Sequence, residues 1–388
     1  MRLAWPCIFA ALCFAPVACK KKATPHTVGL ALDVGGRGDQ SFNDGTLRGL
    51  EAMAAGLRYT PRGYEPLPDD EYRKLVPDAP AHLRIPPPIV LQGKAQEDYE
   101  PNLQLLVDQG AELVIAVGFM MEPATRRVAH DNPRTKFLLI DSPVLDDSGR
   151  PTTLPNVRAV VFREHEGSFL AGALAGELTR TGKVGFVGGM QLPLIQKFEV
   201  GFRAGVQMVN PSAARQVLVA YTGGFDDERK GVEVGQDMYR RGCDIVFHGA
   251  GLDGLGVIKA AQQAGRLVIG VDSDQRHVAP HNVLTSMVKR ADLVVYRSVR
   301  DTLDGSFAGG DMVLGLKDEA LGLAPLGGDA DSAITADARA AAWRDVEALR
   351  AAVVSGRIAV PATLEELSRF APPPAETLGL VHAVARRP

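Results

Sequence analysis

The sequence has few cysteines, and most of them stand at its N-terminus. Cys7, Cys13 and Cys19 lie within the first 19 of its 388 residues, which leaves Cys243 in the body of the chain. One cysteine cannot form an intramolecular disulfide, and it leaves a cysteine-based metal site without its ligands. Cys243 stands in the apolar run 243–247, which predicts a buried strand residue rather than a reactive thiol.

Long apolar runs, strong net charge and common catalytic motifs are also absent. Beyond residue 25 no apolar run reaches the roughly 18 residues that span a bilayer, which excludes a polytopic membrane protein. The formal net charge is −3, so a nucleic-acid partner is not expected. The motifs G-x-x-x-x-G-K-S/T, G-x-S-x-G and H-E-x-x-H do not occur, so the usual signs of an ATP site, a serine hydrolase or a zinc protease are missing.

The N-terminus resembles a bacterial lipoprotein signal. Arg2 supplies a positive charge, residues 3–17 are apolar, and small residues precede Cys19, which would be acylated. An ordinary secretory signal with an incidental cysteine is the alternative. Lysines 20–22 beside an acylated residue favour an anionic lipid surface. We therefore expect residues 1–19 to be signal and acylation site, and the body to be extracytoplasmic and lipid-anchored, in the periplasm or at the surface of a bacterium.

From residue 27 onward, short apolar runs alternate with amphipathic stretches. Continuous apolar strands between helices indicate parallel sheets covered on both faces, and the predicted strands are too many for one small sheet. The fold class predicted is α/β, with two domains. Strands are predicted over 27–33, 89–95, 113–117, 137–141, 157–162, 183–187, 215–221, 245–248, 267–271 and 283–286. Helices are predicted over 42–56, 99–109, 122–132, 166–179, 195–210, 227–241, 256–264, 289–304 and 335–355.

Two proline-rich segments depart from this alternation. Residues 60–88 lie between a helix and its strand, where a connection usually needs about 2–6 residues, so we expect an inserted, solvated surface loop. Residues 371–388 contain three consecutive prolines and read as a tail after the final helix over 335–355.

The first predicted strand ends at Asp33 and is followed by a glycine-rich polar loop. Ligands of open α/β sheets bind at the carboxyl edge of the strands, and this loop carries Asp39, Ser41, Phe42 and Asn43. Its spacing is not the G-x-G-x-x-G of a dinucleotide site. Carboxylates and amides bind hydroxyls and rings stack, so the loop suits a neutral polar ligand with a flat part. The alternative is local: Asp39 and Ser41 cap a helix, and Phe42 packs in the core.

Residues 33–43 resemble the opening signature of the basic membrane protein family, and further motifs follow in order along nearly the whole chain. They occupy residues 98–103, 117–120, 166–172, 182–190, 198–202, 238–239, 270–275 and 284–289. The resemblance implies a substrate-binding lipoprotein of an ABC importer with the two-lobed type I periplasmic-binding-protein fold. Members of this family include purine nucleoside receptors.

The resemblance also implies how the chain divides. We expect an N-terminal lobe of residues 27–163 and 287–312, and a C-terminal lobe of residues 164–286 and 313–370. The chain would cross between the lobes near Phe162, Thr285 and Val313.

Ligand-binding residues follow from the same motifs. The resemblance implies that Phe42 and Phe198 sandwich the base, that Asp39 and Asn43 bond the ligand from the N-terminal lobe, and that Asp272 and Lys289 hold ribose hydroxyls. Each has a structural alternative. Phe198 can be a core residue, Asp272 a loop cap, and Lys289 a solvated residue at the start of a helix.

Three further candidates are less settled. Asp33 either orders the glycine loop or contacts the ligand. Relatives place an aspartate a few residues after the motif at 117–120, where it can bond the base; here Glu122 either substitutes from a shifted position or the contact is lost. Gly251 lies in a loop similar to the family's glycine-rich loop, whereas Asp253 in that loop is favoured as a local cap.

The predicted function is capture of a nucleoside, a purine most of all, by a monomeric binding protein that delivers it to an ABC permease. The alternative is a protein of the same fold that binds another small ligand and presents its closed form to a membrane sensor. A nucleoside hydrolase is disfavoured, because those enzymes hold calcium with a compact aspartate cluster, and five residues separate Asp33 from Asp39 here. We therefore expect no catalysis, cofactor or metal.

Overall fold

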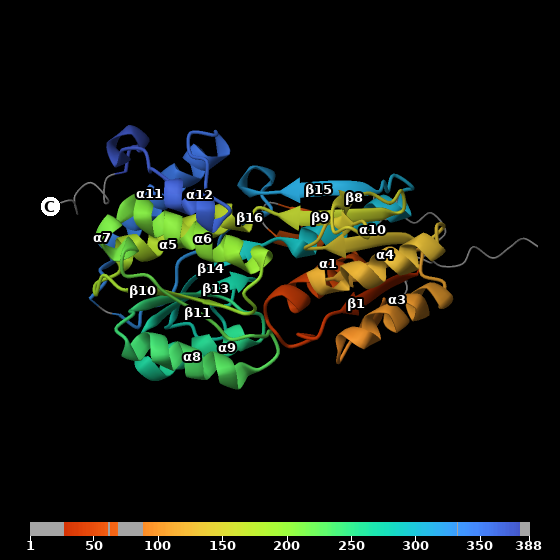
Figure 1. Ribbon diagram of the computed structural model, residues 1–388, viewed down its shortest axis with the longest axis horizontal. Helices are drawn as coiled ribbons and strands as arrows, with labels where there is room; N and C mark the ends of the chain where they lie inside the picture. The colour runs from red at the N-terminus through yellow and green to blue at the C-terminus, as the bar shows by residue number, and fades with distance from the viewer. Residues whose placement is uncertain (1–26, 61–62, 69–87, 332, 381–388) are drawn as a thin grey trace, which may run out of the picture.

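The computed structural model describes residues 27–60, 63–68, 88–331 and 333–380 (Figure 1). The predicted signal with Cys19, most of the proline-rich insert and the end of the tail lie outside the described residues. Two parallel sheets flanked by helices lie side by side along the long axis of the molecule. The predicted α/β, two-lobed fold class is confirmed.

The first sheet and its helices form the N-terminal lobe. Its strands run in the order β15-β9-β6-β5-β1-β4, all parallel. They are β1 (Val28–Leu32), β4 (Ile89–Gln92), β5 (Leu113–Val117), β6 (Lys136–Ile140), β9 (Val157–Phe162) and β15 (Gly310–Leu314). Helix α1 (Phe42–Ala54) packs against α10 (Ala291–Leu303), and α3 (Tyr99–Asp108) packs against α4 (Glu122–Asp131).

The second sheet and its helices form the C-terminal lobe. Its order is β11-β10-β12-β13-β14-β16, parallel except for the antiparallel edge strand β16. The strands are β10 (Val184–Gly188), β11 (Leu218–Tyr221), β12 (Ile245–Gly249), β13 (Leu267–Asp272), β14 (Val283–Lys289) and β16 (Leu321–Leu323). Its helices are α5 (Glu164–Leu178), α6 (Pro193–Val209), α7 (Pro211–Ala214), α8 (Glu228–Arg240), α9 (Asp253–Ala264), α11 (Ala336–Val354) and α12 (Leu364–Arg369).

The central strands are buried on both faces, as continuous apolar runs in a parallel sheet predict. Every residue of β1, β5, β10, β12 and β13 is buried. Helices α5 and α6 pack closely because a glycine of each helix faces the backbone of the other. A Cβ atom added at Gly172 would collide with the carbonyl of Phe202, and one at Gly205 would collide with the carbonyl of Phe169.

The chain passes between the sheets after β9, after β14 and after β15. Residues 287–289 pair with β13 and β16, so they belong to the second sheet, and residues 313–314 pair with β9, so they belong to the first. The expected lobe boundaries at 287 and 313 are therefore wrong by a few residues. We propose that the two lobes, with these corrected boundaries, are the two domains of the chain.

The beginning of the proline-rich insert is not the solvated loop that we expected. Strands β2 (Leu57–Thr60) and β3 (Gly63–Pro66) form an antiparallel hairpin. Within it, the rings of Tyr59 and Tyr64 lie 5.6 Å apart. The Tyr64 hydroxyl donates to Asp292 Oδ2 at 3.0 Å, and Arg290 Nη1 donates to the Tyr59 hydroxyl at 2.8 Å. The hairpin is thus attached to the start of α10.

Some short elements escaped prediction. A hairpin of β7 (Val144–Leu145) and β8 (Pro151–Thr152) follows β6, and 3-10 turns occur at Gln96–Asp98, Phe119–Met121, Leu316–Asp318 and Ala375–Leu378. The last predicted helix is not the final one, since α12 follows α11. Leu378 and Leu380 are buried against the core, so two residues of the expected tail are packed while most of its other described residues are exposed. In the part of the chain that is described, no helix is both long and apolar enough to cross a bilayer.

Candidate ligand-binding site

A cavity lies between the lobes, where the carboxyl ends of strands from both sheets contribute its walls. Residues from the N-terminal lobe that line it are Asp33, Gly35, Asp39, Phe42, Asn43, Gly118, Phe119 and Asp141. Those from the C-terminal lobe are Leu194, Ile195, Phe198, Phe225, Gly249, Gly251, Val271, Asp272 and Lys289. Most of the residues that the sequence singled out therefore meet at one place.

The loop before α1 is organised by two buried carboxylates. Asp39 accepts the backbone N–H groups of Ser41, Asn43 and Asp44 at 2.8–3.1 Å, so it caps the start of α1 while it lines the cavity. Asp33 accepts Gly35 N at 3.0 Å, which orders the glycine turn. Burial raises the pKa of Asp33 and of Asp39 to about 6.

Asn43 joins these carboxylates and leaves an acceptor open. Its Nδ2 donates to Asp33 Oδ1 at 2.9 Å and to Asp39 Oδ2 at 3.1 Å. Its Oδ1 is buried and receives no hydrogen bond from the described residues. A buried acceptor without a donor is costly, so this oxygen is suited to a donor brought by a ligand.

Lys289 is a buried cation between the lobes rather than a solvated residue at the start of a helix. Its Nζ lies 2.6 Å from Asp141 Oδ2 and 3.9 Å from Glu164 Oε1, and 3% of its side chain is exposed. Burial alone would lower the pKa of Lys289, but the carboxylates of Asp141, Asp272 and Glu164 together raise it. The ammonium also lies 4.6 Å from the centre of the Phe42 ring.

Asp272 is the last residue of β13, and its side chain is hydrogen-bonded to the other lobe. Its backbone is left-handed, with φ 61°, and its Oδ2 accepts the hydroxyl of Ser41 at 2.7 Å. The Ser273 hydroxyl in turn donates to the Ser41 carbonyl at 2.9 Å. Burial raises the pKa of Asp272 to about 6. This carboxylate is therefore oriented by the opposite lobe.

Aromatic rings from both lobes line the same cavity. Phe42 is half-buried at the start of α1, whereas Phe198 is 3% exposed and its ring also packs 6.5 Å from Phe247, so it is both a wall and a core residue. Phe119 and Phe225 meet edge to face, with ring centres 6.3 Å apart. Neither Phe119 nor Phe225 was predicted from sequence to line the site, although each follows the carboxyl end of a strand.

Gly251 and Asp253 behave differently, although they are close in sequence. Gly251 lines the cavity with a left-handed φ of 54°, and an added Cβ would lie 3.2 Å from the carbonyl oxygen of Phe225. Asp253 Oδ1 accepts the backbone N–H of Asp227 at 2.6 Å, at the start of α8. Asp253 thus orders the start of α8, 26 positions away in the sequence, rather than its own loop.

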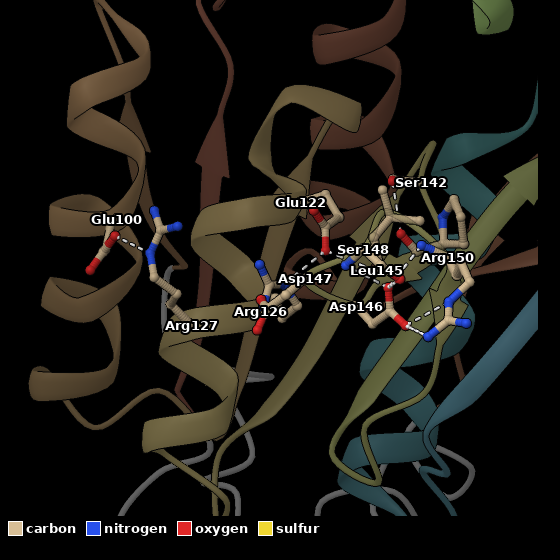
Figure 2. Close-up of polar contacts among 11 residues, drawn as sticks. Glu100, Glu122, Arg126, Arg127, Ser142, Leu145, Asp146, Asp147, Ser148 and Arg150 are labelled. Atoms are coloured by element: carbon tan, nitrogen blue, oxygen red, sulfur yellow. Dashed lines mark hydrogen bonds and ion pairs between the residues drawn. The ribbon is translucent and has the colours of Figure 1, made fainter.

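Glu122 is not among the residues that line the cavity. Figure 2 shows the contacts that its side chain makes instead. Its Oε1 accepts the backbone N–H of Leu145 at 3.0 Å, which ties α4 to β7, and lies 3.5 Å from Arg126 Nε. Arg126 in turn pairs with Asp147 at 2.8 Å. The side chain is directed to the hairpin after β6 and not to the cavity. Of the two alternatives for Glu122, this geometry fits the loss of the base contact.

The chemistry of the cavity follows from these groups. Its buried oxygens accept hydrogen bonds, its rings offer flat faces, and Lys289 supplies a positive charge already paired with a carboxylate. Within the described ranges, no group of three His, Cys, Asp or Glu side chains is arranged to hold a metal ion. These groups are chemically suited to a flat ligand that carries hydrogen-bond donors.

Comparisons with known proteins point the same way. Residues 27–340 match the family described as "ABC transporter substrate-binding protein PnrA-like". The chain is 32% identical to basic membrane protein D of Borreliella burgdorferi, over 79% of this chain and 82% of that protein. It is 30% identical to the ABC transporter nucleoside-binding protein BmpA of Lactococcus lactis, over 88% and 90%. A solute-binding protein of an ABC transporter system from Aeropyrum pernix matches in structure with a TM-score of 0.70 at 26% identity, over 89% of this chain and 96% of that one.

Proposed function

The chain belongs to the family of PnrA-like substrate-binding proteins of ABC transporters, and from this premise we propose that it captures a nucleoside, preferably a purine nucleoside, for import. The relative from Lactococcus lactis is named a nucleoside-binding protein, and it matches over most of both chains. The family is one of binding proteins, and the proposal includes no catalytic step.

The observation that carries the proposal is the division of the cavity into rings and acceptors. Phe42 and Phe198 line it from opposite lobes, next to the carboxylates of Asp39 and Asp272 and the unpartnered amide oxygen of Asn43. A nucleoside has a flat base that stacks on rings and a sugar whose hydroxyls donate to carboxylates. Both parts of such a ligand find a matching group.

In the proposed complex the base lies between Phe42 and Phe198, and the sugar lies toward Asp272 and Lys289. An ionised carboxylate accepts two vicinal hydroxyls, and the ammonium donates to a further oxygen. Because Asp272 comes from one lobe and Phe42 from the other, the ligand bridges both lobes and stabilises their closed arrangement.

We extend the proposal to the cellular context. A lipid on Cys19 would hold the protein at the outer face of a bacterial membrane, where it would pass its ligand to an ABC permease as a monomer. The residues concerned lie outside the described part of the chain, so this extension rests on the signal-like sequence around Cys19 and on membership of the family.

Isothermal titration tests the proposal. The full chain, purified in detergent and unfolded and refolded to remove carried ligand, is titrated with adenosine, guanosine, inosine, uridine and ribose. Submicromolar binding of a purine nucleoside, with no binding of ribose, supports it. Binding of uridine alone would contradict the purine preference, and silence toward all five would overturn the proposed function.

A further inference from the structure

Arg290 stands where the chain leaves β14 in the C-terminal lobe and begins α10 in the N-terminal lobe. Its backbone N–H donates to the carbonyl of Ala320 at 2.9 Å, next to the pairing of Lys289 with Leu321 of β16. Its side chain is bonded instead to groups of the N-terminal lobe. Arg290 is therefore held by both lobes at a point where the chain crosses between them.

The guanidinium group of Arg290 has two partners. Its Nε and Nη2 donate to the two carboxylate oxygens of Asp292, each at 2.9 Å, and its Nη1 donates to the Tyr59 hydroxyl at 2.8 Å. The carbon at the centre of the guanidinium also lies 4.5 Å from the centre of the Tyr59 ring. A two-pronged pairing with a carboxylate and a cation over an aromatic face are both favourable for arginine, so this side chain has a defined position.

The partners of Arg290 are themselves fixed. Tyr59 and Tyr64 are paired across the hairpin of β2 and β3, and the Tyr64 hydroxyl donates to Asp292 Oδ2 at 3.0 Å. The Tyr64 ring also packs 6.1 Å from the ring of Tyr296 on α10. A Cβ atom added at Gly49 of α1 would lie 2.1 Å from the carbonyl oxygen of Asp292. The hairpin, α1 and α10 thus form one packed support for the arginine.

This support lies next to the cavity in sequence. Lys289, which directly precedes Arg290, lines the cavity and donates to Asp141 in the N-terminal lobe. Movement of one lobe against the other requires the backbone angles of the crossing segments to change. Because the N–H of Arg290 is bonded to one lobe and its side chain to the other, rotation at this crossing breaks at least one of these contacts. The contacts therefore favour the arrangement in which Lys289 lines the cavity.

We infer that Tyr59 and Arg290 are positioning residues: the hairpin fixes the crossing after β14, keeps Lys289 at the cavity and slows the opening that releases the ligand. The part of the inference that concerns ligand release rests on the proposed function, whereas the fixed crossing does not. Tyr64 belongs to the proline-rich insert of residues 60–88, so the start of this insert acquires a role in retaining the ligand.

The test uses substitutions that leave the cavity lining intact. Tyr59→Phe removes the hydroxyl and keeps the ring, Arg290→Gln removes the charge, and the double variant combines them. Tyr239→Phe is the matched control, because it also loses one hydroxyl hydrogen bond, to the carbonyl of Leu267 within the C-terminal lobe. For the full chain and each variant, hydrogen exchange is followed in ligand-free protein, and dissociation of adenosine and of guanosine is followed by stopped flow.

We expect the peptide that covers residues 286–292 to exchange faster in Tyr59→Phe and faster still in Arg290→Gln, since local opening exposes the N–H of Arg290. Dissociation of the bound nucleoside should be at least about threefold faster in Tyr59→Phe and about tenfold faster in Arg290→Gln. The double variant should match Arg290→Gln within about twofold, because Tyr59 acts through Arg290. Tyr239→Phe should behave as the unchanged chain does in both measurements.

Other outcomes overturn the inference. Faster exchange confined to the peptides of the hairpin, with unchanged dissociation, would mean that Tyr59 only stabilises its own hairpin, and nucleoside capture would stand. Additive effects in the double variant would mean that Tyr59 does not act through Arg290.

Two further cases are also decided. If the unchanged chain binds neither nucleoside, the proposed function fails, and exchange of residues 286–292 alone then supports or overturns the fixed crossing. Thermal unfolding shows whether each variant is folded, and Tyr59→Phe still decides the matter if Arg290→Gln is not.

Discussion

The hydroxyl of Ser41 in the N-terminal lobe donates a hydrogen bond of 2.7 Å to Asp272 Oδ2 in the C-terminal lobe. Ser41 also accepts, through its carbonyl, the hydroxyl of Ser273 from the same lobe as Asp272. The carboxylate proposed to hold the sugar is therefore aligned only when the lobes are together. Closure of the lobes and completion of the site are one event in this geometry.

Replacing Ser41 should weaken ligand binding without removing a ligand contact. Ser41→Ala loses the hydrogen bond that orients Asp272, so we expect about fivefold lower affinity for the bound nucleoside, ~1 kcal/mol. Titration together with a stopped-flow dissociation rate checks this, and the loss should appear as faster dissociation. Ser355→Ala, at the end of α11 and remote from the cavity, is the control. Equal affinities for the two variants would show that the bond does not orient the site.

The two rings should respond differently to truncation. Phe42→Ala should cost at least about tenfold in affinity (~1.4 kcal/mol) and lower the melting temperature less than Phe198→Ala does, because this ring packs against the core but is only half-buried. Phe198→Ala should lose affinity and also about 3 kcal/mol of unfolding free energy, because its ring packs in the core. Titration and thermal unfolding of both variants separate the effects. Nearly wild-type affinity of Phe42→Ala would refute the stacking role.

Glu122 should be dispensable for binding. Its carboxylate bonds the backbone of Leu145 and lies outside the cavity, so Glu122→Gln should keep the affinity of the unchanged chain and lose at most about 1 kcal/mol of stability (Figure 2). Titration with each purine nucleoside provides the measurement. A tenfold loss for any of them would restore Glu122 as a base contact and would require α4 to move on binding.

Affinity should depend on pH through the buried aspartates. Burial raises the pKa of Asp33, Asp39 and Asp272 to about 6, so these groups take up protons as the pH falls from about 7.5 to about 5. A protonated carboxyl is a weaker acceptor for a hydroxyl, and nucleoside affinity should therefore fall over this window. Titrations at half-unit steps check the profile, and Asp272→Asn should flatten it. Affinity that is constant from pH 7.5 to 5 would contradict it.

The same aspartates should make the ligand-free protein more stable as the pH falls, which is opposite to their effect on affinity. Because the folded pKa of Asp272 lies above its unfolded value of 3.8, protonation favours the folded state at low pH, and this contribution is lost as the pH rises through about 6. Asp272→Asn carries no charge at any pH. It should therefore raise the melting temperature of the ligand-free protein more at about pH 7.5 than at about pH 5. Equal shifts at the two values would mean that the burial cost is offset by Lys289.

The parts of the site that could be predicted from sequence are those whose residues are neighbours along the chain or stand at the end of an apolar strand. Asp39, Phe42 and Asn43 stand in one turn after a strand, so a strand-to-helix connection brings them to the sheet edge together. Asp272 ends a continuous apolar run, and the edge position follows from that run. The lobed fold could be predicted because fully buried strands alternate with helices along the chain.

The remaining parts depend on contacts between distant segments. Asp141 and Lys289 are 148 positions apart, and no local pattern shows that their side chains meet. The direction of the Glu122 side chain could not be predicted, because its carboxylate bonds the hairpin of β7 and β8, whose pattern is too short to be recognised from sequence. The packed hairpin of Tyr59 and Tyr64 was hidden in a proline-rich stretch for the same reason.

The close packing of α5 and α6 has a consequence for how ligand choice can change in this protein. Since Gly172 and Gly205 leave no room for a Cβ atom, the two helices form a stiff unit that carries Glu164 at the start of α5 and Phe198 within α6. Substitutions that shift one of these helices relative to the other would force them apart and destabilise the fold. Adaptation to a new ligand is therefore more open to the loops around Phe119 and Phe225, which lie outside the two helices.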